Sequence, residues 1–167
     1  SNGAGYAHPE GDKYKKLAGQ VHLVPVAGLS LVGYVDYEKQ TASDRAWTYK
    51  LDAFFEMIRG LTLGGEWFSY DNSLNRNPDL AHYNVSGYSV FGRLVAVQDK
   101  LNLFARFDRY EPNTKVSNDE INLIIAGFDY APVHSSFKLQ PNIWYYTYSD
   151  STRKDDVVFN FTFFLSF

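Results

Sequence analysis

The sequence predicts an all-β fold made of consecutive antiparallel strands, and three observations lead to this prediction. Apolar and polar residues alternate with a period of two in one segment after another, as they do in strands that have two different faces. The connections between these segments are alternately short turns and long polar loops. Aromatic residues, which are common in strands, make up 17% of the chain, with 13 Tyr and 13 Phe.

The last segment, 157–167, shows the alternation most clearly. Large apolar residues stand at every second position, namely Val157, Phe159, Phe161, Phe163, Leu165 and Phe167. Polar residues stand between them at Asn160, Thr162 and Ser166, so one face of the strand is apolar and the other is mostly polar. The length of the segment matches the roughly 9–11 residues that a tilted strand needs to cross a bilayer.

Further alternating segments precede this one, and they bring the total to roughly nine strands. In chain order they lie at 17–23, 29–37, 47–57, 61–67, 88–96, 101–107, 120–130 and 137–145. The phase of segment 120–130 is ambiguous, because Ile121, Leu123, Ile124 and Ile125 occupy both faces. Pro141 lies inside a strand and has no amide proton to donate, which predicts a bulge or a local break at that position.

The connections follow a regular order along the chain. Short turns are expected at 25–28, 59–60, 98–100 and 131–134, and long polar loops near Glu10, Gln40, Asn75, Thr114 and Arg153. Successive connections of an antiparallel sheet lie at opposite ends of the strands. The short turns are therefore expected at one end of the sheet, together with the terminal carboxylate, and the long loops at the other end.

Composition excludes several classes of protein. No run approaches the roughly 18 apolar residues of a transmembrane helix, and the mean hydropathy is −0.32. The net charge of −3 argues against an electrostatic nucleic-acid binder. The absence of cysteine excludes disulfides and thiolate chemistry. No signal peptide is recognisable, so an exported protein would be seen here as its mature chain or as a piece of it.

The terminal strand resembles the C-terminal signal of Gram-negative outer-membrane β-barrels. The match covers Phe159, Phe161, Phe163, Leu165 and Phe167, and the repeated strand–turn–strand pattern extends it over most of the chain. The resemblance implies that the barrel assembly machinery reads this strand and that the strand closes the barrel. It also implies a bacterial outer-membrane location, with outer-membrane lipid and lipopolysaccharide as neighbours.

The fold expected from these observations is an antiparallel transmembrane β-barrel with about nine or ten strands visible. Single-chain bacterial barrels have even strand numbers, so residues 1–167 are expected to be a single barrel domain or the C-terminal segment of a larger barrel. The opening residues 1–6 resemble the end of a strand, which favours the larger barrel. The alternative is a soluble β-sandwich or lipocalin-like barrel whose apolar face points to a core.

Aromatic residues near the strand ends, together with the terminal strand and the order of the loops, favour the membrane barrel over the soluble alternative. They are Tyr37, Trp67, Tyr88, Tyr110, Tyr145 and Tyr148. Sequence alternation alone does not separate the two folds, because either one places a polar face opposite an apolar face.

Charged residues on the face opposite the apolar one are the candidate site. They are Lys50, Asp52, Glu56, Glu66, Arg93, Arg106 and Asp108. The resemblance to porins implies that they line a pore for passive diffusion of small hydrophilic solutes. In a small barrel they would instead form a salt-bridged plug. The protein would then be a non-conducting scaffold, an adhesin or a subunit of a larger complex, and its oligomeric state stays open.

No residue pattern predicts catalysis, a metal site or a cofactor. The four histidines do not have the spacing of a metal or catalytic motif: His8, His22, His82 and His134. Segment 71–79 places oxygen side chains at alternate positions, as a calcium loop does, but Arg76 stands where such a loop has glycine. A polar surface loop is the favoured interpretation, and the chain is not expected to be an enzyme.

Overall fold

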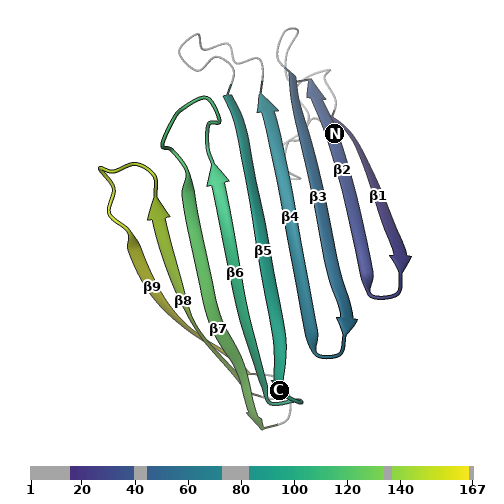
Figure 1. Cartoon of the computed structure of the whole chain (residues 1–167), viewed down its shortest axis with the longest axis vertical. Coiled ribbons are helices and arrows are strands. Elements are labelled where there is room, and N and C mark those ends of the chain that lie inside the picture. The colour runs from purple at the N-terminus through teal and green to yellow at the C-terminus, as the bar shows by residue number, and fades with distance from the viewer. Residues whose placement is uncertain (1–15, 40–44, 73–82, 134–136, 166–167) are drawn as a thin grey trace.

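The protein is an all-β chain in which the described residues form one antiparallel sheet (Figure 1). The computed structural model describes residues 16–39, 45–72, 83–133 and 137–165. The nine strands pair in sequence order without a crossover. They are β1 Lys16–Val26, β2 Leu29–Lys39, β3 Arg45–Ile58, β4 Leu61–Asn72, β5 Tyr83–Val97, β6 Leu101–Glu111, β7 Ile121–Val133, β8 Phe137–Tyr148 and β9 Asp156–Leu165. Within the described ranges, no helix is long and apolar enough to cross a membrane.

The sheet has two chemically different faces, as the period-two alternation predicts. The register aligns apolar residues across the strands, for example Leu51 with Trp67 and Val90 with Phe107. We call this side the apolar face and the opposite side the polar face. Ala46 is the only buried hydrophobic residue within the described ranges, whereas Phe159 on the apolar face is 80% exposed. The sheet is therefore a single layer whose apolar face is not covered by any other described part of the chain.

The two ends of the sheet differ as expected, with tight hairpin turns at the end drawn lowest in Figure 1. Gly28 and Gly60 have φ angles of 83° and 78°, which glycine adopts without strain. The carbonyl oxygen of Gly28 accepts a hydrogen bond from the Glu56 amide at 2.7 Å, and that of Gly60 accepts one from the Val95 amide at 2.7 Å. Each of these turns is thereby joined to the next hairpin.

The predicted turn at 131–134 is wrong, because β7 continues to Val133. The Ala131 amide donates a hydrogen bond to the carbonyl oxygen of Lys100 at 2.8 Å, which extends the pairing past the expected end of the strand. Pro132 lies where the register with β8 shifts, between Tyr130 and Val133. A strand tolerates proline at such an irregularity, since no ladder hydrogen bond from its nitrogen is required there.

Of the bulge or local break predicted at Pro141, the structure shows the break, because β7 and β8 have no paired residues between Gly127 and Tyr130. No bulge occurs there. The β7–β8 register is the same before and after this position, with Gly127 opposite Asn142 and Tyr130 opposite Leu139. Pro141 also pairs in register with Phe161 of β9. A Cβ atom at Gly127 would lie 2.5 Å from the carbonyl oxygen of Pro141, so glycine allows the two backbones to approach closely.

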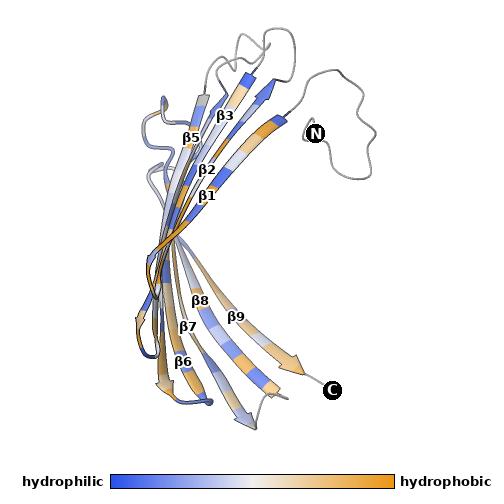
Figure 2. Cartoon of the chain, turned by 90° about the vertical axis from the view of Figure 1, so that its right-hand side faces the viewer, coloured by the Kyte–Doolittle hydropathy of each residue, from blue (hydrophilic) through white to orange (hydrophobic). Residues whose placement is uncertain are grey.

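The predicted barrel is not closed by the described residues, which form an open, twisted and bowed sheet (Figure 2). Within the described part of the chain β1 pairs only with β2, and β9 pairs only with β8. All neighbouring strands are antiparallel. An odd number of antiparallel strands leaves the first and the last pointing in the same direction. The two edges therefore cannot join each other in an antiparallel pair.

Candidate functional site

The charged side chains of the polar face meet near the middle of the sheet. The register places Asp52, Glu66, Ser89 and Asp108 next to one another on β3, β4, β5 and β6. Lys50 precedes Asp52 by two residues, and Arg106 precedes Asp108 by two, so all of these side chains point to the same side. Five residues that the sequence predicts for the site are thereby brought together.

These five residues form a continuous chain of ion pairs, which we call the ion-paired band: Lys50, Asp52, Glu66, Arg106 and Asp108. The Nζ atom of Lys50 lies 3.3 Å from Oδ1 of Asp52 and 3.4 Å from Oε2 of Glu66. The guanidinium group of Arg106 lies 3.5 Å from Oε1 of Glu66 and 2.6 Å from Oδ1 of Asp108. Glu66 thus bridges both cations and connects the two halves of the band.

The band has more carboxylates than cations. Arg106 and Lys50 are 44% and 41% exposed, so solvent screens each ion pair and weakens it. Ser89 lies between Glu66 and Asp108 and is 4% exposed, and its hydroxyl oxygen has no hydrogen-bond partner in the described part of the chain. Oδ1 of Asp52, although it is ion-paired with Lys50, also has no hydrogen-bond partner in the described part of the chain. The band therefore presents charge to solvent, and two buried polar atoms in or beside it lack a hydrogen bond from any described group.

The other two predicted site residues lie on the polar face but outside the band. The carboxylate of Glu56 accepts a hydrogen bond from the Thr62 hydroxyl at 3.4 Å. Arg93 is the cross-strand neighbour of Thr62 on the other side and lies nearer the short turns. The sequence alternation places both on the correct face, but only the register shows that they are separate from the five ion-paired residues.

The structure also places an apolar region on the polar face, and the sequence interpretation missed it. Beside the ion-paired band, β7, β8 and β9 contribute Leu123, Ile125, Trp144, Tyr146 and Val158. The rings of Trp144 and Tyr146 have centroids 6.4 Å apart. The alternation of Lys138, Gln140 and Asn142 predicts Trp144 and Tyr146 on the same face if it is continued along the strand. This signal was present in the sequence.

A second polar cluster near the long-loop end joins β1 to β2. The carboxylate of Asp36 is 4% exposed and lies 3.0 Å from Nζ of Lys16. It also accepts a hydrogen bond from the Tyr34 hydroxyl at 2.7 Å. Alternation places Asp36 and Tyr34 on one face, but the ion pair with Lys16 depends on the β1–β2 register.

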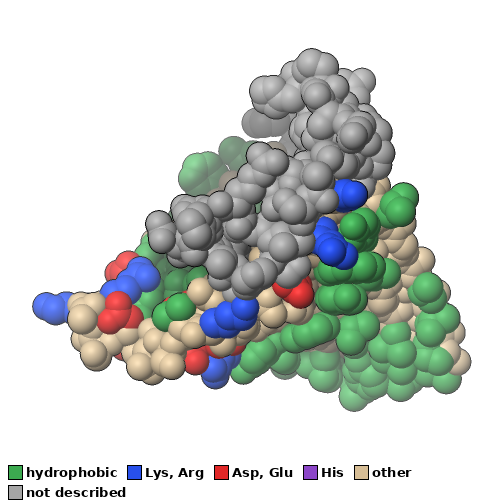
Figure 3. Space-filling model, turned by 90° about the horizontal axis from the view of Figure 1, so that it is seen from above, with side chains coloured by type: hydrophobic (Ala, Val, Ile, Leu, Met, Phe, Trp, Pro, Cys, Tyr) green, Lys and Arg blue, Asp and Glu red, His purple; other side chains and the backbone are tan. Residues whose placement is uncertain are grey.

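The apolar face carries the residues of the C-terminal pattern and a group of aromatic rings. Phe161, Phe163 and Leu165 are 64%, 62% and 58% exposed, and Phe167 lies outside the described residues. Near the long loops, the ring centroids of Tyr37 and Trp47 lie 4.8 Å apart. Hydrophobic side chains gather along one side of the sheet when it is viewed from the long-loop end (Figure 3).

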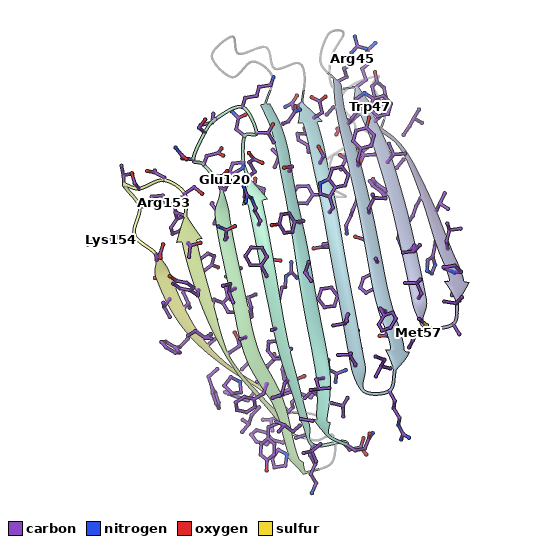
Figure 4. All side chains as sticks on the ribbon, in the orientation of Figure 1. Arg45, Trp47, Met57, Glu120, Arg153 and Lys154 are labelled. Carbon is purple, nitrogen blue, oxygen red and sulfur yellow. The ribbon has the colours of Figure 1, made fainter. Side chains whose placement is uncertain are left out.

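The long-loop end is held by polar contacts of its own. Nη2 of Arg109 lies 3.1 Å from Oε1 of Glu120. A hydrogen bond from the side chain of Ser149, assisted by Arg109, lowers the pKa of Glu120 below its ordinary value. Hydrogen bonds from Thr152 likewise lower the pKa of Asp150. Glu120 and the neighbouring Arg153 lie on this end of the sheet in Figure 4.

The remaining sequence candidates contribute little to a site. His22 shares a hydrogen bond with the Ser30 hydroxyl, with Nε2 and Oγ 2.7 Å apart. Three histidines, His8, His82 and His134, and positions 73–79 of the loop with the calcium-like pattern lie outside the described residues. In the ranges that the structure describes, no group of three or more His, Asp or Glu residues could hold a metal ion.

Comparisons with protein-family models, with curated proteins and with solved structures find no match to this chain. The geometry of the two faces is therefore the basis for inferring the function.

Proposed function

We propose that this chain forms part of the wall of a porin-like β-barrel in the bacterial outer membrane and lets small hydrophilic solutes diffuse passively. The observation that carries the proposal is the single-layer sheet with an uncovered apolar face and a central band of ion pairs on the other face. In a bilayer, lipid covers the first face and water fills the space next to the second. The proposal includes no catalytic activity.

The dimensions of the apolar face support a membrane setting. Trp47 lies near the long-loop end of β3 and Met57 near the short-turn end (Figure 4). The ten residue steps between them span about 33 Å along the strand, which a tilt of about 40° reduces to roughly 25 Å. The apolar band of known outer-membrane barrels is about 25 Å tall and is flanked by aromatic residues.

The two outer strands of the described sheet require further partner strands in such a setting. Unpaired backbone groups are not tolerated next to lipid, because each costs several kcal/mol and no water can satisfy it. Since β1 and β9 point in the same direction, an odd number of additional strands is needed for antiparallel closure. We infer that the complete barrel contains these strands, and that the terminal strand with Phe159, Phe161 and Phe163 is the part read by the assembly machinery.

The polar face supports the channel function. An ion-paired band that is only partly shielded from solvent can interact with passing ions and polar solutes. Its carboxylates, Asp52, Glu66 and Asp108, outnumber its cations, Lys50 and Arg106. The proposed pore therefore favours cations over anions at this level.

Cysteine accessibility in a planar bilayer tests the proposal, because the chain has no cysteine of its own. Lys50→Cys places a thiol on the polar face, and Leu51→Cys places one on the apolar face at the adjacent position. A charged, membrane-impermeant thiol reagent is expected to change the single-channel current of the first variant and to leave the second unmodified. Modification of both positions, or of position 51 alone, would contradict the proposed orientation.

A second candidate function is a non-conducting barrel that acts as a scaffold, an adhesin or a subunit of a larger complex. The apolar region formed by Leu123, Ile125, Trp144 and Tyr146 favours it, since such a surface can pack against a segment that fills the interior. The same bilayer experiment separates the two functions. A correctly inserted barrel without current steps would refute the channel and support the scaffold.

A further inference from the structure

A group of cations lies on the polar face near the short turns, apart from the ion-paired band. They line a cavity of about 550 Å³, which we call the cationic pocket. Its charged residues come from β5, from the turn that follows it, and from β7 and β8: Arg93, Asp99, Lys100, Asp129 and Lys138. The turn between β5 and β6, which contributes Asp99 and Lys100 to the pocket, lies at the end of the sheet that is drawn lowest in Figure 1.

The cations of this pocket differ from those of the band, because they have no partner among the described residues. The side chains of Arg93, Lys100 and Lys138 are exposed. None of them forms a hydrogen bond or an ion pair with the residues that the structure describes. By contrast, Lys50 and Arg106 each contact two carboxylates. The described part of the chain therefore leaves positive charge uncompensated at one end of the polar face.

The two carboxylates of the pocket already have neutral partners. Oδ1 of Asp129, a residue that is 9% exposed, accepts a hydrogen bond from Nε2 of Gln140 at 2.7 Å. Oδ1 of Asp99 accepts one from Nε2 of Gln98 at 3.1 Å. The pocket thus holds three cations against two carboxylates, and no other described residue uses its cationic donors.

We propose that the cationic pocket binds a small oxyanion with two negative charges, of the phosphate or dicarboxylate type. The guanidinium group of Arg93 can donate two parallel hydrogen bonds to such an anion, and the ammonium groups of Lys100 and Lys138 add point charges from other elements. Binding itself needs only the polar face. Its consequence for transport, a pore that concentrates anions near one mouth, rests on the proposed function.

Titration of the purified protein in detergent micelles with inorganic phosphate, followed by calorimetry, tests the pocket. Arg93→Gln and Lys138→Gln are each expected to weaken binding on the order of tenfold, since each removes a charge-assisted contact. The matched control Lys154→Gln removes the same charge from the loop at the opposite end of the strands (Figure 4) and is expected to leave the affinity unchanged. Lys100→Gln is a further variant for the case that a strand variant does not fold, because Lys100 lies in an exposed turn. It is also expected to weaken phosphate binding.

Two results would overturn the proposal that the pocket binds an oxyanion. One is that phosphate does not bind to the unmodified protein, and the other is that Lys154→Gln weakens phosphate binding as much as the pocket variants do. The bilayer measurement keeps this proposal separate from the proposed function. Phosphate binding without current steps would support the pocket and refute the channel. Current steps without phosphate binding would support the channel and refute the pocket.

Discussion

Charge reversal at Arg106 is the most direct test of the ion-paired band as a determinant of ion preference. Arg106 is 44% exposed and lies between the carboxylates of Glu66 and Asp108. The band has three carboxylates and two cations. After the substitution Arg106→Glu it has four carboxylates and one cation, Lys50. Cation preference is therefore expected to rise.

The magnitude follows from screened Coulomb interaction. A unit charge about 6 Å from a passing ion contributes roughly 0.4 kcal/mol in water at about 0.1 M salt, and a reversal changes two charges. The local cation concentration then rises about 3.6-fold and the anion concentration falls by about the same factor. The permeability ratio of cations to anions is expected to increase roughly tenfold at about 0.1 M salt and only about twofold at 1 M.

Reversal potentials in a KCl gradient across a planar bilayer measure this ratio. Lys154→Glu is the matched control, because it makes the same charge change in the loop after β8 at the far end of the strands. Its effect is expected to be clearly smaller. The reasoning would be refuted by an unchanged ratio in Arg106→Glu at low salt, or by a shift that stays the same at 1 M salt.

The remaining predictions concern stability. Phe161→Lys places a charge on the apolar face and is expected to destabilise the folded protein in lipid by about 2–4 kcal/mol, whereas Thr162→Lys on the polar face costs much less; urea unfolding in vesicles compares them. Gly64→Val is expected to cost about 1–3 kcal/mol by the same assay, because a side chain there meets the ring of Phe91; wild-type stability would contradict the close contact. The lowered pKa of Glu120 means that its ionised carboxylate stabilises the folded protein fully above its ordinary pKa of 4.5. This stabilisation is lost as pH falls through the pKa of the folded state. Hydrogen exchange in loop 112–120 is therefore expected to rise at acid pH in the unmodified protein and to show less pH dependence in Glu120→Gln.

Much of the fold follows from local pattern, and the errors have local causes. The alternation identified all nine strands and the faces of Lys50, Asp52 and Arg106. The turn at 131–134 was misplaced because proline is a turn residue in most contexts, whereas here Pro132 lies at a register shift inside β7. The resemblance predicted a barrel or the C-terminal segment of a larger one, and the described strands form an open sheet.

The candidate site was likewise predictable from the sequence only in part. That seven charged residues share one face could be predicted, since period two places alternate residues on one side. That five of them form one band depends on the stagger between strands, which brings Glu66 between Lys50 and Arg106. No residue pattern within one strand carries that information.

The sequence by itself determined the strands, the identity of the two faces and the difference between the two ends, because side-chain alternation and turn chemistry are local properties. The tertiary structure decided the phase of β7, the partners of each charge and the cationic pocket. Register and sheet curvature determine these features, and both arise from interactions between residues far apart in the chain. Arg93 and Lys138 line one cavity only because β5 to β8 are placed side by side in a bowed sheet.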